Sequence, residues 1–156
     1  MTQTESVISA APFVVRRRVK WSECDPAGVV DTVVFSEYVQ SAAELFYERL
    51  FGIPPQRAKE EQGFGTPSRA LSLDSRRPLR RDEEFDMTIE VGAIATCAYR
   101  LDVTARIADG SIAFTAQLTS ECIARDECRA IPVPAALRRA IEGYREPRTA
   151  RSSTQR

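Results

Sequence analysis

The chain has 156 residues, which by length is one domain and is enough to bury a hydrophobic core. Its 22 basic residues equal its 22 acidic residues, so its charge gives no reason to expect nucleic acid or an anionic membrane as a partner. No apolar run approaches the roughly 20 residues that span a bilayer. The N-terminus does not have the pattern of a secretory signal, and we therefore expect a cytoplasmic protein.

Residues 1–11 are small and polar, and they predict a flexible lead-in to a domain over residues 12–146. Residues 13–21 mix β-branched with basic side chains and predict a first strand. The run Cys-Asp-Pro-Ala-Gly follows at residues 24–28, where Asp-Pro and Gly predict a turn.

The longest predicted element is a helix over residues 33–51. Its apolar side chains recur at spacings of three and four, with polar side chains on the opposite face. An N-cap is expected at Asp31 or Thr32, and Gly52, followed by Ile-Pro-Pro, predicts the stop. The apolar face consists of Phe35, Tyr38, Val39, Ala42, Phe46 and Leu50.

The remaining sequence predicts an antiparallel sheet. Alternating apolar residues favour strands at 68–74, 85–91, 99–107 and 112–122, with a hairpin at Asp109-Gly110. Pro134 predicts the start of a closing helix, and residues 147–156 predict a disordered tail. The order of elements predicts an α+β fold with a curved antiparallel sheet around one long buried helix.

The residue types exclude several kinds of chemistry. The chain has no histidine, which excludes Ser-His-Asp and Cys-His arrangements and HExxH metal helices. Its four cysteines form no CxxC pair, so we expect neither a zinc site nor another metal site. We expect Cys97 and Cys122 to fill core space as small apolar residues. Carboxylates, backbone dipoles, hydroxyls or thiols are left to carry any reaction.

Asp25 is the main candidate for chemistry. It lies in a turn just before the longest helix, where the first amides have no partner within the helix and the helix dipole is positive. An oxyanion would be stabilised there, and a nearby carboxylate could attack an acyl group or activate water. The pattern alone also fits a structural role for Asp25 as a turn or cap residue.

The stretch Trp-Ser-Glu-Cys-Asp-Pro-Ala-Gly-Val-Val at residues 21–30, followed by the helix, resembles the 4-hydroxybenzoyl-CoA thioesterase family of hot-dog proteins. The resemblance covers residues 13–141. It continues through Gly-Ile-Pro-Pro at 52–55, Gly-Thr-Pro at 65–67, the alternating strands, and Arg-Ala-Ile-Pro-Val-Pro at 129–134.

This resemblance implies an acyl-CoA thioesterase that works as a homo-oligomer, a dimer or a dimer of dimers, with active sites between subunits. Asp25 would act as nucleophile or general base, and the Thr32 amide would belong to the oxyanion hole. Gly28 and Thr66 are counted among the substrate-binding residues, with Thr66 lining the acyl pocket from the neighbouring subunit. Coenzyme A would be part of the substrate, and no separate cofactor is implied.

Three departures from the family pattern concern the substrate. Asp31-Thr32-Val33 replaces the usual aromatic and Pro run, and Gln40 stands where the 4-hydroxybenzoyl enzyme has a carboxylate for the phenol. The position of the family's basic CoA-binding cluster falls near Cys97–Tyr99, which is not basic here, although Arg100 is adjacent. An alternative phosphate anchor is the arginine group Arg76, Arg77, Arg80 and Arg81, which is equally consistent with a solvated turn.

The sequence therefore predicts hydrolysis of an aryl- or medium acyl-CoA, or of a carrier-protein thioester. A non-catalytic hot-dog protein that binds acyl-CoA or a small aromatic ligand is the alternative, because the start of the helix differs from the family pattern. A hot-dog dehydratase is disfavoured by the absence of histidine, and a purely structural oligomer stays open.

Overall fold

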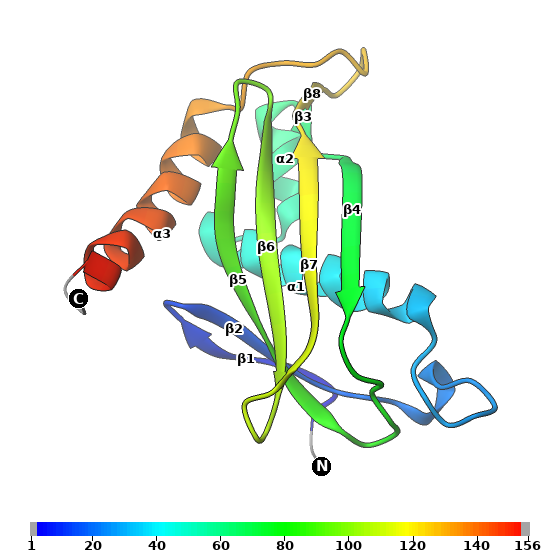
Figure 1. Ribbon diagram of the computed structural model, residues 1–156. Helices are drawn as coiled ribbons and strands as arrows, with labels where there is room; N and C mark the ends of the chain where they lie inside the picture. Colours follow the sequence, from blue (N-terminus) through cyan, green and yellow to red (C-terminus); the bar gives the residue numbers. More distant parts are fainter. Residues whose placement is uncertain (1–2, 154–156) are drawn as a thin grey trace.

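The computed structural model describes residues 3–153, and it describes side chains as far as residue 145. One six-stranded antiparallel sheet has the order β1-β2-β5-β6-β7-β4. The long helix α1 (Thr32–Phe51) crosses one face of this sheet (Figure 1). The predicted α+β fold is confirmed. The strands are β1 (Glu5–Ala10), β2 (Phe13–Arg18), β4 (Ser68–Ser75), β5 (Glu84–Ile94), β6 (Ala98–Ile107) and β7 (Ile112–Glu121).

Alternation along the strands builds the core against α1. In β5 the side chains of Phe85, Met87 and Ile89 are buried, and the residues between them are not. The inner-facing rows continue across strands, because Leu101 pairs with Leu118, which in turn pairs with Leu71 of β4. A slip of one residue would expose a whole row, so the burial pattern fixes the register.

Helix α1 begins and ends at capping residues. The Asp31 carboxylate accepts a hydrogen bond from the Val33 amide at 3.0 Å. At the other end, Gly52 has a φ of 71° and its amide donates to the Glu48 carbonyl, a left-handed conformation that glycine adopts without steric cost. The predicted helix is thus confirmed, with its start one residue earlier than expected.

Five elements differ from the sequence predictions. Residues 5–10 form β1 instead of a flexible lead-in, because their backbone pairs with β2 at the sheet edge. Helix α2 (Pro55–Gln62) occupies a stretch that was expected to be irregular. The short strands β3 (Phe64–Gly65) and β8 (Ile123–Ala124) form a second, two-stranded sheet. Helix α3 (Ala135–Ser153) extends through most of the expected tail; the tail's last residues, 154–156, and residues 1–2 of the lead-in lie outside the described residues.

Helix α3 is fastened to the sheet near β5. The Tyr144 hydroxyl donates to the Ile89 carbonyl and accepts from the Phe13 amide. Its ring packs edge-on against Phe46 of α1, with ring centroids 5.0 Å apart. Nowhere in residues 3–153 is there a helix of sufficient length and apolar character to cross a membrane.

The cysteines are all free thiols. Cys122 is fully buried, as predicted for a core residue, and Cys97 is partly buried. Burial raises the pKa of the Cys122 thiol to about 11, so this thiol stays protonated near neutral pH. No group of three metal-ligating side chains occurs among the described residues.

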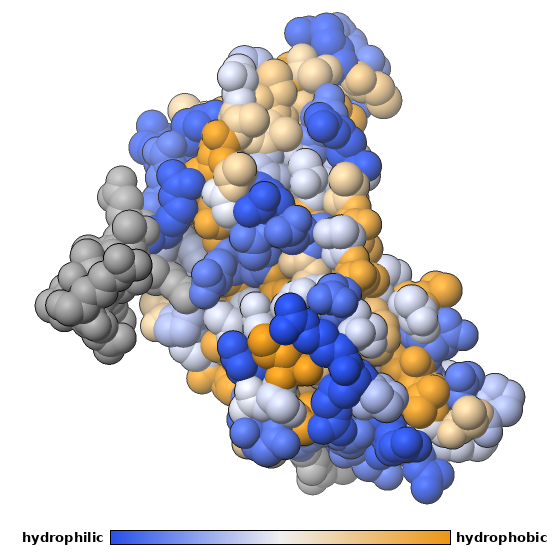
Figure 2. Space-filling model, in the orientation of Figure 1, coloured by the Kyte–Doolittle hydropathy of each residue, from blue (hydrophilic) through white to orange (hydrophobic). Residues whose placement is uncertain are grey.

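Strand β4 is an outer strand of the sheet, and its inward-facing Leu71 and Leu73 are only partly buried. In Figure 1 the N-terminal end of α1 extends past β4, together with the loop before it. Figure 2 shows apolar surface along this side of the molecule, next to a mainly polar sheet face. The loop with Asp25 therefore projects beyond the β4 edge.

Candidate active site

The Asp25 loop is a tight turn built by backbone hydrogen bonds. The Gly28 amide donates to the Asp25 carbonyl at 2.9 Å, and the Asp25 amide donates to the Val29 carbonyl at 2.8 Å. Gly28 has a φ of 83°, which favours glycine at this position. The Asp25 carboxylate is half-buried, and its one hydrogen bond to the described residues is a long one, 3.3 Å from the Val29 amide.

Two β-bridges fasten this loop to its surroundings. Cys24 pairs with Val30 across the turn, and Val29 pairs with Arg80 of the connection between β4 and β5. The Val30 amide also donates to the Leu79 carbonyl at 2.8 Å. Arg80 and Asp25 are therefore brought to one place although they lie far apart in the sequence.

A partly buried polar network lies directly behind the loop. Arg17 donates to Glu23 at 2.7 Å and to Glu5 at 3.3 Å, and its guanidinium lies 5.0 Å from the centre of the Tyr38 ring. Glu23 also accepts from the Tyr38 hydroxyl at 3.1 Å. Burial and the Glu23 charge raise the pKa of Tyr38. Because Glu23 is two residues before Asp25, this network fixes where the loop begins.

The first amides of α1 differ in whether they have an acceptor. The Val33 amide donates to the Asp31 carboxylate, and the Val34 amide donates to the Asp31 carbonyl at 2.9 Å. In the described part of the chain no acceptor is found for the Thr32 amide. Thr32 thus offers a free N–H group at the positive end of the helix.

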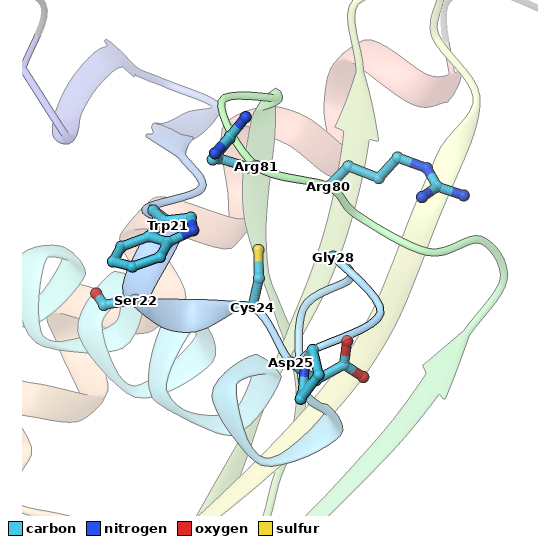
Figure 3. A pocket seen from close by; sticks show the side chains of 8 residues that line it. Trp21, Ser22, Cys24, Asp25, Gly28, Arg80 and Arg81 are labelled. Carbon is cyan, nitrogen blue, oxygen red and sulfur yellow. The ribbon is translucent and has the colours of Figure 1, made fainter.

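A cavity of about 740 Å³ opens beside this loop. Figure 3 shows Cys24 between Trp21 and Gly28, with Asp25 on the loop and Arg80 and Arg81 on the neighbouring segment. Trp21 is 75% exposed, so its indole face is open to a ligand. Among the described residues Arg80 has no ion-pair partner, whereas Arg81 pairs with Asp82 at 3.6 Å.

The other predicted basic residues lie away from this cavity. Arg76 pairs with Asp74 at 3.3 Å, and Arg77 pairs with Glu83 at 3.0 Å. Arg100 lies on β6, where its guanidinium pairs with Asp102 at 2.7 Å. Of the four arginines in that group, Arg80 and Arg81 line the cavity. They reach it because Arg80 pairs with Val29 in a β-bridge that holds their segment against the Asp25 loop.

Gln40 and Thr66 meet at a second cavity, of about 340 Å³, between α1, α2 and the β4–β7 edge. The Gln40 amide donates to the Ser68 hydroxyl at 3.1 Å. The Thr66 hydroxyl is buried beside the Tyr99 hydroxyl, but it makes no well-aligned hydrogen bond within the described chain. In a single chain these two residues do not line the Asp25 cavity.

Tyr47 and Tyr99 lie at the second cavity, and their hydroxyls are 2.5 Å apart. Burial raises the pKa of both Tyr47 and Tyr99. Tyr47 lines the cavity together with Lys59 of α2, whose ammonium lies 5.0 Å from the centre of the Tyr47 ring. Burial lowers the pKa of Lys59.

The sequence analysis did not single out Trp21, Ser22, Cys24 or Lys59 as cavity residues. Trp21, Ser22 and Cys24 lie within four residues of Asp25 in the sequence, so their place beside it in the cavity could have been predicted. Lys59 had no such signal, since it reaches the second cavity from a helix that the sequence did not predict.

Solved structures with the same fold include known thioesterases. A 1,4-dihydroxy-2-naphthoyl-CoA thioesterase from Synechocystis superposes with a TM-score of 0.75 at 22% identity, covering 83% of this chain and 94% of that one. A hypothetical protein from Thermus thermophilus gives 0.75 at 25% identity, covering 84% and 98%. A Staphylococcus aureus protein in complex with CoA gives 0.80 at 13% identity, covering 94% and 88%.

These likenesses confirm the predicted hot-dog fold. No curated protein matches the chain significantly. The model of the thioesterase-like superfamily matches residues 19–141, a range that includes Asp25, all of α1 and four of the six strands of the main sheet. The predicted class, a hot-dog thioester hydrolase, is thereby confirmed at the level of the superfamily. The chain belongs to the thioesterase-like superfamily.

Proposed function

We propose that this protein hydrolyses an acyl-CoA thioester with Asp25 as its catalytic carboxylate. Two observations carry the proposal: the Asp25 carboxylate is half-buried without a cationic partner among the described residues, and the Thr32 amide, seven residues later at the start of α1, is open. Both belong to a chain of the thioesterase-like superfamily.

In this mechanism the thioester carbonyl oxygen accepts a hydrogen bond from the Thr32 amide. Asp25 either removes a proton from water, whose oxygen then attacks the carbonyl carbon, or attacks that carbon itself. Negative charge develops on the carbonyl oxygen, where the helix dipole stabilises it. The C–S bond then breaks and coenzyme A leaves as a thiolate. Where Asp25 is the nucleophile, water then hydrolyses the acyl-Asp25 anhydride, which frees the acid and regenerates the carboxylate. Because a thiolate is a good leaving group, the absence of histidine does not block the reaction.

Coenzyme A would lie over the cavity beside Asp25. Its phosphates fit the guanidinium groups of Arg80 and Arg81, since arginine pairs well with phosphate oxygens. The exposed Trp21 offers an aromatic face for the adenine or for the pantetheine chain. The Staphylococcus aureus structure of the same fold, which contains CoA, supports this assignment of the ligand.

The complete site would need two copies of the chain. If β4 pairs antiparallel with β4 of a second copy, the Ser68 end of one strand lies beside the Ser75 end of the other. The Gln40–Thr66 cavity is at the Ser68 end, and the connection that leads to Arg80 and the Asp25 loop follows the Ser75 end. Each Asp25 loop, which projects past β4 (Figure 1), would then face the second cavity of the other copy.

The acyl group would therefore enter the Gln40–Thr66 cavity. An aryl or medium-length acyl group suits a cavity of about 340 Å³. Two solved structures of the same fold are thioesterases of aryl-CoA compounds, one acting on 1,4-dihydroxy-2-naphthoyl-CoA and one on gentisyl-CoA. They support an aryl-CoA as one class to test.

A second candidate function is binding of acyl-CoA without hydrolysis. The Asp31 carboxylate favours it, because its negative charge stands at the start of α1 and would oppose an oxyanion beside Thr32. Tight binding of acyl-CoA without release of free thiol would select this alternative.

The test is thiol release from a panel of benzoyl-, hydroxybenzoyl-, phenylacetyl- and straight-chain acyl-CoAs. We expect Asp25→Asn to lose at least 100-fold in kcat while the protein stays folded and oligomeric, a loss on the order of that for other groups acting in acid–base catalysis. Asp126→Asn is the matched control, since Asp126 is exposed and lies outside both cavities. Full activity in folded Asp25→Asn would refute the assignment.

A single turnover in ¹⁸O-labelled water addresses the role of Asp25. Label found in the Asp25 carboxylate after the turnover would identify it as the nucleophile, because water must then have attacked an acyl-enzyme at that side chain.

We expect the oligomer to be a dimer or a dimer of dimers, which sedimentation analysis measures directly.

A further inference from the structure

The second cavity is polar where helix α2 lines it. Lys59 and Gln56 of α2 line it there, and the same two residues with Thr66 also line an adjoining cavity of about 310 Å³. A cavity for a plain hydrocarbon or phenyl group would be lined mainly by apolar side chains. The lining of this one instead offers charged and hydrogen-bonding groups to a ligand.

Lys59 is the cationic group of this cavity, and it lacks an ion-pair partner among the described residues. Its ammonium lies over the Tyr47 ring, a contact that does not satisfy its three N–H donors. Glu44 faces it from α1 and lines the same cavity, but beyond the distance of an ion pair. A half-buried ammonium without a close anion is a costly arrangement that a bound anion would relieve.

Thr66 is a second, independent feature of the same cavity. Its hydroxyl is buried and lacks a well-aligned hydrogen-bond partner in the described chain. The neighbouring Tyr99 hydroxyl is already hydrogen-bonded to Tyr47, and because buried hydroxyls are nearly always satisfied, we expect a ligand group to complete the hydrogen bonding of Thr66. Thr66 and Lys59 line both cavities, so the Thr66 hydroxyl and the Lys59 ammonium can bind the same ligand group.

We propose that the preferred substrates are acyl-CoAs whose acyl group carries a carboxylate at its far end, bound by the Lys59 ammonium and the Thr66 hydroxyl. This inference rests on the proposed function, because it assigns the second cavity to the acyl group. The carboxylate accepts hydrogen bonds from both side chains. Glu44, which also lines the cavity, opposes the carboxylate, so binding has to come from Lys59 and Thr66.

An anionic group at Lys59 could also be a phosphate of coenzyme A. The two sources differ in a measurable way. A phosphate is present in every acyl-CoA, so losing Lys59 would weaken all of them equally. An acyl carboxylate is present only in the acidic substrates, so losing Lys59 would weaken those alone.

The experiment compares matched pairs that differ by one carboxylate: glutaryl- against pentanoyl-CoA, adipoyl- against hexanoyl-CoA, and 4-carboxybenzoyl- against benzoyl-CoA. We expect the best pair to favour the acidic member about tenfold or more in kcat/KM, as for hydrogen bonds between charged groups. In Lys59→Met this ratio should fall toward one. Arg57→Met is the matched control, because Arg57 lies on the same helix, is exposed and pairs with Glu61; its ratio should equal that of the natural protein.

Three outcomes would overturn the inference while leaving the proposed function intact. The acidic member is not favoured in any pair, Lys59→Met keeps the preference, or Lys59→Met weakens both members of a pair equally. The last outcome would assign Lys59 to a phosphate of coenzyme A.

Binding provides a readout that does not depend on turnover. The affinity of Asp25→Asn for adipoyl- and hexanoyl-CoA, measured by calorimetry, should show the same preference, and adding Lys59→Met should remove it. If the natural protein hydrolyses none of the thioesters, the proposed function fails, and the calorimetric ratio still supports or overturns the acidic acyl group.

Discussion

Replacing Arg17 with Met tests whether the polar network behind the Asp25 loop stabilises the fold. The substitution keeps the length of the side chain and removes the cation between Glu5 and Glu23. Exposed ion pairs contribute about 0–1 kcal/mol, whereas removing one partner of a buried pair costs about 3–5 kcal/mol. The side chains of Arg17 and Glu23 are 12% and 10% exposed, so we expect a loss near the lower buried value, about 3 kcal/mol.

Urea unfolding at a fixed protein concentration measures this loss, and for a domain of this size about 3 kcal/mol corresponds to a Tm lower by roughly 6–12 °C. Arg16→Met is a matched control, because Arg16 is next to Arg17 on β2 but faces the other side of the sheet, where it makes an exposed pair with Asp86 of β5. It should cost less than about 1 kcal/mol. Adding Glu23→Gln to Arg17→Met should restore part of the stability, since the uncompensated charge is removed. An Arg17→Met protein as stable as Arg16→Met would refute the reasoning.

Three further predictions concern the cap, the buried tyrosines and the open hydroxyl. Asp31→Asn keeps a capping oxygen for the Val33 amide but removes the negative charge beside the oxyanion, so urea unfolding should change by less than about 1 kcal/mol while kcat rises. Because burial raises the pKa of Tyr47 and Tyr99, the folded state holds their protons more tightly; this stability is complete below pH about 10 and falls above it, so tyrosinate absorbance should appear together with loss of circular dichroism. Thr66→Val removes a hydroxyl without a well-aligned partner, so the free energy of unfolding should stay equal or rise by up to about 1 kcal/mol while the preference for acidic acyl groups falls.

Local sequence signals were sufficient for the main helix and strands. Helix α1 follows from an Asp cap, a spacing of three and four, and Gly52, all of which act within a few residues. The strands of the central sheet follow from the alternation of apolar and polar residues, since the apolar residues of each strand are buried on one face of the sheet. The predicted turn at Asp25 is likewise local, since Asp25, Gly28 and Val29 hydrogen-bond to one another.

The missed elements depend on distant contacts or on an ambiguous signal. Pro54-Pro55 was taken as a stop for α1, but Pro55 is also the first residue of α2, where its fixed φ suits a helix start. Strand β1 has mostly exposed or half-buried side chains, so its alternation is weak and its pairing with β2 defines it. Which arginines reach the Asp25 cavity depends on the bridge between Val29 and Arg80, which joins segments about fifty residues apart.

The two ends of the proposed site are built in physically different ways. The end with Asp25 is made mainly from backbone: a tight turn, two β-bridges and the open amide of Thr32. Backbone geometry survives large changes of sequence, which agrees with a fold shared at 13–25% identity. The acyl end is made from side chains of α1, α2 and the segment before β4, such as Gln40, Lys59 and Thr66. Each of these can change without disturbing the fold, and selectivity in a shared fold resides in such side chains. Substitutions at the first end should therefore change kcat for every substrate, and substitutions at the second should change which acyl group is preferred.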